Sequence, residues 1–166
     1  MIAAMPDYAH ADMIAALAAT PSWLRDAVSA LGPESSEARP VDAWGAGDVI
    51  RHVRAADAII TGRVWHIAVR HGAPLPAFDE RAWARLYAAS GVPLTEQMQH
   101  FALRRAELVA VLRSLASKDW ARTGEHESAG TMSVADLCRN VVTHEAEHRA
   151  QLDAIVAAAR PGADSS

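Results

Sequence analysis

The sequence predicts an all-α fold, specifically a four-helix bundle, and three observations lead to this class. The chain has 166 residues, of which 51% are hydrophobic and 22% charged, a composition that suits one domain with a core of ordinary size. Apolar residues recur at helical spacing in four long segments. No stretch alternates apolar and polar residues between hairpin turns, as β-strands would. We therefore expect one domain over residues 1–166, built without strands.

The first helix is expected over residues 7–31, along an apolar stripe that ends at Leu31. Pro21 lies deep inside this segment, where proline disrupts a helix, so we expect a kink or a restart there. Gly32 and the proline after it should end the helix, and residues 34–40 should form a polar loop.

The second helix is expected to begin after Trp44 and to run to about His71. A long connection over residues 72–93 follows, which leaves room for a crossover between the second and third helices. Within it, residues 79–89 should form a short helix capped by Asp79.

The third helix is expected over residues 94–117, with Thr95 as a plausible N-cap. Its apolar face carries leucine, methionine and phenylalanine at helical spacing, while its arginines lie mostly off that face. Residues 118–132 should then form a loop.

The fourth helix should begin near Ser133, which is a typical N-cap residue. Asp136 follows at the spacing of a capping box. The apolar stripe fades at residues 160–162, so we expect residues 161–166 to form a frayed tail.

Composition and charge exclude several classes of function. The 16 basic residues are scattered in a chain of net charge −4, which argues against a nucleic-acid-binding face. No apolar run approaches the roughly 18 residues that span a membrane, and the amino-terminal region lacks the basic residues of a secretory signal. The single cysteine, Cys138, excludes an internal disulfide and a multi-cysteine zinc site, and we expect it to be a buried structural thiol. We therefore expect a cytoplasmic protein that acts on a small-molecule substrate, with no nucleic acid or membrane as partner.

Three histidines carry the chemistry that the sequence suggests. His144 and His148 are four residues apart on the fourth helix, where Cβ atoms at this spacing lie about 5–6 Å from each other. His52 takes a position on the apolar stripe of the second helix. Buried imidazoles are costly unless each has a partner, and one metal ion would serve all three. A single histidine on an apolar face is usually a hydrogen-bonded core residue, but three together favour a metal site with one coordination position open to water or substrate.

The same segment also matches the H-E-x-x-H signature of zinc proteases. In that interpretation His144 and His148 bind zinc and Glu145 is the base. We set it aside because a third ligand usually follows downstream, where only Asp153 and Asp164 remain as ligand types. The strand-rich substrate cleft of such proteases is also not predicted.

Two further residues are candidates for proton transfer at the metal. Glu145 could accept a proton or support a ligand, although pairing with Arg149 or another solvated side chain is the simpler expectation. His126 lies in the loop that leads to the fourth helix and could lean over the site, although we favour a surface position for it.

Three segments resemble the DinB/YfiT-like family of metalloproteins, and the resemblance spans nearly the whole chain. Residues 44–53, WGAGDVIRHV, resemble its W-s-x-x-[ED]-v-l-x-H-l segment. Residues 120–134 resemble its approach to the last helix, and residues 143–152, THEAEHRAQL, resemble its H-x-x-x-H-x-x-q-l helix. Gly45 departs from the pattern, since serine is common there, but it touches no expected ligand.

The resemblance implies a four-helix bundle that binds a divalent metal ion, zinc or nickel, through His52, His144 and His148, and that frequently forms a homodimer. Some relatives are transferases or isomerases that use a low-molecular-weight thiol such as bacillithiol or mycothiol. The leading hypothesis is therefore a metal-dependent thiol S-transferase acting on small electrophiles. The alternatives are a hydrolase that uses metal-bound water, a non-catalytic, stress-linked metal-binding protein, and a metal-free bundle that dimerises through an apolar face.

Overall fold

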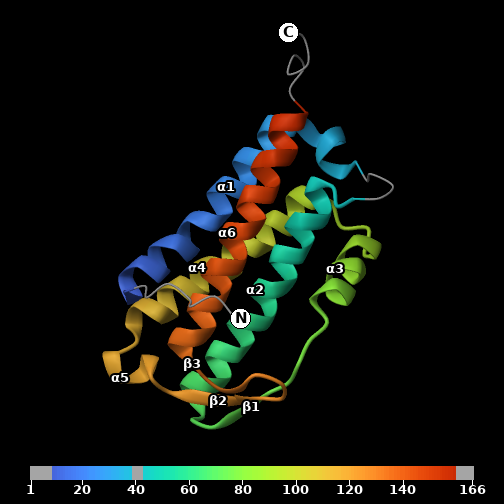
Figure 1. The fold of residues 1–166 in the computed structure, drawn as a ribbon. Coiled ribbons are helices and arrows are strands. Elements are labelled where there is room, and N and C mark those ends of the chain that lie inside the picture. Colours follow the sequence, from blue (N-terminus) through green and yellow to red (C-terminus); the bar gives the residue numbers. More distant parts are fainter. Residues whose placement is uncertain (1–8, 39–42, 160–166) are drawn as a thin grey trace, which may run out of the picture.

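The computed structural model describes residues 9–38 and 43–159 and forms a four-helix bundle, as expected (Figure 1). Its long helices are α1 (His10–Glu37), α2 (Ala46–Val69), α4 (Leu94–Ser114) and α6 (Val134–Ala158). Both α1 and α2 pack against both α4 and α6. In Figure 1, α1 and α6 run toward the top while α2 and α4 run toward the bottom. The bundle is therefore not an up-and-down meander, and α2 and α6 are antiparallel neighbours.

The connection between α2 and α4 climbs the length of the bundle, because α2 ends at the bottom of Figure 1 and α4 begins near the top. This confirms that the long connection makes a crossover. It carries α3 (Glu80–Ala89), which packs against α2. Asp79 caps α3 as predicted, since its Oδ1 accepts a hydrogen bond of 2.9 Å from the Ala82 amide.

Helix α1 breaks at Gly32 and not at Pro21, so the expected kink at the proline was wrong. Pro21 has no N–H to donate to the carbonyl of Leu17, one turn earlier. Arg105 of α4 supplies the missing donor, because its Nη1 lies 3.0 Å from Leu17 O. Gly32 takes the left-handed φ of 77°, after which the helix resumes to Glu37. The expected loop over residues 34–40 is therefore helical to residue 37, and the rest of it lies mostly outside the described residues.

Helices α4 and α6 differ in how well their starts were predicted. Pro93, not Thr95, is the N-cap of α4, because the helix already begins at Leu94. For α6 the capping box is confirmed: the Ser133 hydroxyl accepts from the Asp136 amide at 3.1 Å, and the Asp136 carboxylate accepts from the Ser133 amide at 3.0 Å. The predicted tail over residues 161–166 lies outside the described part of the chain.

A small three-stranded sheet closes one end of the bundle, so the expectation of a fold without strands was wrong. Its strands are β1 (Ala73–Leu75), β2 (Thr123–His126) and β3 (Gly130–Ser133), in the order β1-β2-β3. Strands β2 and β3, with α5 (Ser117–Trp120), replace the loop expected over residues 118–132, and α5 shortens the expected third helix. Strand β1 lies in the connection expected over residues 72–93. Strands of three or four residues are too short to show an alternating pattern.

The pairing of β1 with β2 depends on a glycine. β1 is parallel to β2, with Ala73 opposite Gly124. A Cβ at Gly124 would lie 2.7 Å from the Ala73 carbonyl oxygen, so a larger residue could not approach as closely. The sheet holds His126 at the end of β2, next to the bundle.

Helix α6 also carries Cys138, which is fully buried, as expected. Burial raises the pKa of this thiol to about 12, so it is unreactive. No helix within residues 9–38 and 43–159 has both the length and the hydropathy that crossing a membrane requires.

Candidate metal centre

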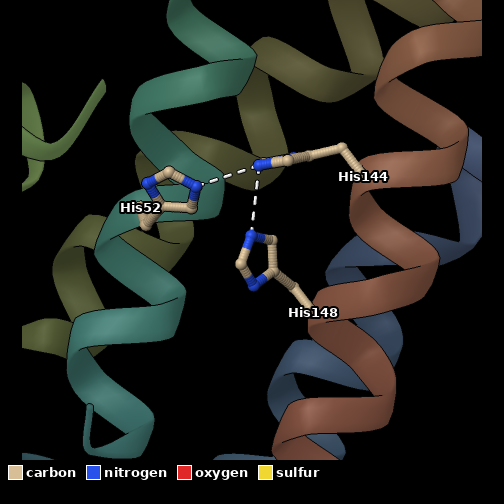
Figure 2. A group of neighbouring side chains, drawn as sticks. All are labelled: His52, His144 and His148. Atoms are coloured by element: carbon tan, nitrogen blue, oxygen red, sulfur yellow. Dashed lines mark hydrogen bonds between the residues drawn. The ribbon is translucent and has the colours of Figure 1, made fainter. Parts of the chain in front are cut away.

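Three histidine side chains from two helices meet inside the bundle (Figure 2). His52 projects from α2, and His144 and His148 project from neighbouring turns of α6. His144 Nε2 lies 2.9 Å from His52 Nε2 and 3.1 Å from His148 Nε2. The structure thus brings together the three residues that the sequence singled out. Their positions follow from the packing of α2 on α6, which sets an early turn of α2 beside the middle of α6.

The arrangement fits a divalent cation. Ligand nitrogens about 2.0–2.1 Å from a tetrahedral ion lie roughly 3.3 Å from one another, close to the separations observed here. His148 Nδ1 is 3.0 Å from Gln151 Oε1, and because that oxygen can only accept, the ring proton sits on Nδ1 and leaves Nε2 free to ligate. A neutral imidazole has only one N–H. Hydrogen bonds among the three neutral rings therefore cannot satisfy all three Nε2 atoms.

The electrostatics keep two of these rings, those of His52 and His144, neutral, which is the state a metal requires. Burial, together with the smaller effect of the nearby His144 and His148, lowers the pKa of His52 to about 4. Burial and the neighbouring His148 likewise lower the pKa of His144. At neutral pH both rings therefore carry no charge.

This pKa shift predicts how the metal-free protein responds to acid. His52 has its ordinary pKa of 6.5 in the unfolded chain and about 4 in the folded chain, so between these values protons bind preferentially to the unfolded state. The stabilisation is complete above pH 6.5 and is lost as the pH falls toward 4, by up to about 3 kcal/mol at about 1.4 kcal/mol per pKa unit. Urea unfolding followed by circular dichroism in the presence of a chelator measures it. A His52→Asn variant should lose this part of the pH dependence, and curves parallel to those of the wild type would contradict the expectation.

An aromatic ring covers one side of the cluster. The Trp44 ring centroid lies 5.1 Å from that of His52, edge to face, and 6.3 Å from that of His148, nearly parallel at 14°. Trp44 precedes α2 and therefore packs against the histidines of both helices. It shields the cluster from water on that side.

Glu80 is a residue of this site that sequence reasoning missed. It stands in the first turn of α3, and its Oε2 lies 3.5 Å from His52 Nε2 and 3.7 Å from His144 Nε2. Its side chain is 40% exposed. An acidic residue just after an N-cap is ordinary in a helix, because it complements the helix dipole, so no sequence signal set it apart. Only the packing of α3 on α2 brings this carboxylate to the histidines.

A cavity of about 260 Å³ opens beside His144 and Glu80. Arg63 and His126 add polar groups to its wall, and the remaining wall is largely apolar: Ala56, Ile60, Ala129, Met132, Leu137 and Val141, with Asn140 among them. Pockets for drug-sized ligands occupy about 300–1,000 Å³. This cavity therefore suits a small molecule that reaches the histidine cluster from one side.

The two proton-transfer candidates lie in different places. His126 is half-buried and lines this cavity, so the surface position that we favoured for it was wrong. Glu145 is 4% exposed and does not line the cavity, and the expected solvated pairing with Arg149 was also wrong. Its carboxylate accepts from Arg105 at 2.5 and 3.0 Å and from the Thr20 hydroxyl at 2.6 Å. Proton transfer by Glu145 stays a prediction, which this geometry disfavours because both oxygens are already bonded.

Comparison with known proteins agrees with the fold. The model of one family, the DinB superfamily, matches residues 15–152. One similar solved structure is YfiT from Bacillus subtilis, described as a probable metal-dependent hydrolase with an unusual four-helix bundle topology. The two share 16% sequence identity at a TM-score of 0.80, over 95% of this chain and 91% of that one, so the likeness concerns the fold. No curated protein matches the chain.

Proposed function

Because this chain belongs to the DinB superfamily, we propose that it is a metal-dependent enzyme acting on a small molecule. His52, His144 and His148 would hold a divalent cation, zinc or nickel, through their Nε2 atoms. A cation held there would act as a Lewis acid and would bring the pKa of a coordinated water toward about 7. The homodimer and the cytoplasmic location stay predictions.

One observation carries the proposal: the histidine cluster meets a carboxylate and a cavity on the same side. Glu80 Oε2 stands within 3.7 Å of two of the three cluster nitrogens, and both Glu80 and His144 line the cavity. A nucleophile that enters there can give its proton to Glu80 while the substrate occupies the cavity. Trp44 excludes water from another side of the cluster.

We propose hydrolysis as the reaction. The cavity of about 260 Å³ has room for a small substrate and a water molecule, but little for a bulky second substrate. The description of the structurally similar YfiT as a probable metal-dependent hydrolase supports the same reaction class.

A second candidate is transfer of a low-molecular-weight thiol to a small electrophile. A separate cavity of about 480 Å³ is lined by Trp44, Arg81 and Arg85, among others. The Trp44 ring borders both this cavity and the cluster, so a thiol lodged here could bring its sulfur to the cluster if that ring moved aside. In this reaction Glu80 would take the proton of the thiol instead of that of water.

The test measures metal content and turnover together. Protein purified without an affinity tag is analysed for zinc and nickel, then assayed on small esters and amides, and on electrophiles with several thiols. We expect Glu80→Gln to lower kcat by about 100-fold or more, because a general base typically contributes 10²–10⁴-fold. Its affinity for the metal should change only a few-fold.

Glu96→Gln is the matched control, since Glu96 also lies in the first turn of a helix, α4, and is exposed. Turnover only with an added thiol would replace hydrolysis by thiol transfer. Bound metal without turnover of any compound would leave a non-catalytic metal-binding protein.

A further inference from the structure

The cavity beside the histidine cluster has a second polar feature that the proposed reaction does not use. Arg63 of α2 and His126 of β2 both line it, and Arg63 Nη2 lies 2.9 Å from His126 Nε2. A distance of this size normally marks a hydrogen bond between a donor and an acceptor. Whether it does so here depends on which nitrogen of the His126 ring carries the proton.

The turn after β2 determines that tautomer. His126 Nδ1 lies 3.2 Å from the Ser128 amide nitrogen and 3.1 Å from the Ala129 amide nitrogen. Backbone N–H groups only donate, so Nδ1 is the acceptor and its lone pair faces them. In the neutral ring the proton must then be on Nε2, and in the charged ring Nε2 carries a proton as well.

Arginine and the Nε2–H of His126 are therefore two donors that face each other. A guanidinium has five N–H donors and no acceptor, so the 2.9 Å contact between Arg63 and His126 is not a satisfied hydrogen bond. Arg63 Nη2 also donates to the Pro76 carbonyl at 2.7 Å, which holds the side chain in place. Its Nε is buried and has no hydrogen-bond partner among the described residues. Apart from the Pro76 carbonyl, no hydrogen-bond acceptor within the described part of the chain serves these donors.

We propose that Arg63 and His126 form a subsite for the carboxylate of the substrate, which would accept a hydrogen bond from each. This inference rests on the proposed function and names its substrate class: a small molecule with a carboxylate at one end and the reacting group at the other. A planar carboxylate matches the geometry of a guanidinium. The apolar side chains of Ile60, Leu137 and Val141 would contact the short body between the two ends.

The charges around the cavity agree with an anionic ligand. Glu80 also lines it, but its close contacts are to His52 and His144, at the reacting end. The Arg63 guanidinium balances this one carboxylate, so the wall carries no net negative charge even without a cation in the histidine cluster. Burial lowers the pKa of Arg63, and an anion bound beside the guanidinium would favour its charged form.

Binding is tested by NMR on the His126 ring resonances, using butyrate, its neutral analogue butyramide and inorganic phosphate as probes. We expect butyrate to shift these resonances in a saturable way, and butyramide to be without effect. Arg63→Met should weaken butyrate binding about 10- to 100-fold, the value of a charge-assisted pair. Arg63→Lys, which keeps the charge but loses the planar fork, should lie between the two. Arg113→Met, at an exposed position of α4 outside the cavity, should bind as the wild type does.

The His148→Ala variant separates this subsite from the metal centre. Its butyrate affinity at His126 should stay within about two-fold of the wild type, because the subsite does not include the cluster. The proposal would be overturned if butyrate binding disappeared in His148→Ala or survived in Arg63→Met. It would also be overturned if butyramide bound as well as butyrate, or if only phosphate shifted the His126 resonances. If no enzymatic turnover is found but the NMR result holds, the subsite stands and the proposed function fails.

A kinetic comparison uses monoethyl succinate, which carries a carboxylate, and ethyl butyrate, which does not. Arg63→Met should raise KM at least 10-fold for the first ester with little change in kcat, and should leave KM for the second nearly unchanged. An equal effect on both esters would mean a structural role for Arg63.

Discussion

Replacing His148 with alanine is expected to lower the affinity of this protein for Zn²⁺ by about 10²–10³-fold. Structural zinc sites bind with roughly 10–16 kcal/mol shared among four ligands, so one ligand accounts for about 3–4 kcal/mol. The loss should be near the upper value because His148 is the ring whose tautomer the protein already holds for ligation, through Gln151. His52→Ala and His144→Ala should behave similarly.

Competition with a chelator measures the affinity, and the visible spectrum of the Co²⁺-loaded protein reports the coordination geometry. Zn²⁺ at 100 times its Kd should stabilise the wild type by about 2.7 kcal/mol, which raises Tm by about 5–10 °C in a chain of this size. The same concentration should leave the Tm of His148→Ala nearly unchanged. His100→Ala, at an exposed position of α4, is the control. If no divalent metal changed the Tm of the wild type, this result would contradict the proposed metal centre.

Replacing Arg105 with methionine is expected to destabilise the fold by about 3–5 kcal/mol. Arg105 is 1% exposed and lies between two buried carboxylates: it donates to Asp57 at 2.9 Å and to Glu145 at 2.5 Å. Removing one partner of a buried ion pair leaves an uncompensated charge, which typically costs this much. The same side chain donates to Leu17 O, so α1 would also lose the hydrogen bond that compensates for Pro21.

Urea unfolding at pH 7 measures the effect. Glu145→Gln, which keeps a hydrogen-bonding side chain of the same size, should cost less than Arg105→Met. Arg113→Met, at an exposed position of the same helix, should change the free energy of unfolding by less than about 0.5 kcal/mol. A loss below about 1 kcal/mol for Arg105→Met would show that the two carboxylates find other partners or become protonated.

The helices were predictable because their signals are local. Apolar residues at a period of 3.6 and capping residues such as Ser133 and Asp79 act within one or two helical turns. They can therefore be recognised in a short stretch of the sequence. The same periodicity placed His52, His144 and His148 on inward faces. The strands escaped prediction because each of the three is shorter than an alternating pattern needs, and β1 pairs with a strand about 50 residues away.

Local signals failed where a residue far away in the chain determines the environment of the residue in question. Pro21 predicts a break in isolation, but Arg105, 84 positions later, replaces the donor that proline lacks. Glu145 reads as a solvated helix residue, yet it is buried because Arg105 and Thr20 meet it from α4 and α1. In the sequence Glu80 is an ordinary acidic residue of a first helical turn, and only the packing of α3 against α2 brings it to the histidines.

The sequence by itself determined that four amphipathic helices would form and that three histidines would face inward, since side-chain direction in a helix follows directly from spacing along the chain. Only the tertiary structure decided that those histidines meet, that Glu80 joins them, and that Arg63 and His126 present two donors to one cavity. Such contacts depend on how helices and strands far apart in the chain pack together, and no pattern within a single helix or strand specifies which distant residues it will contact.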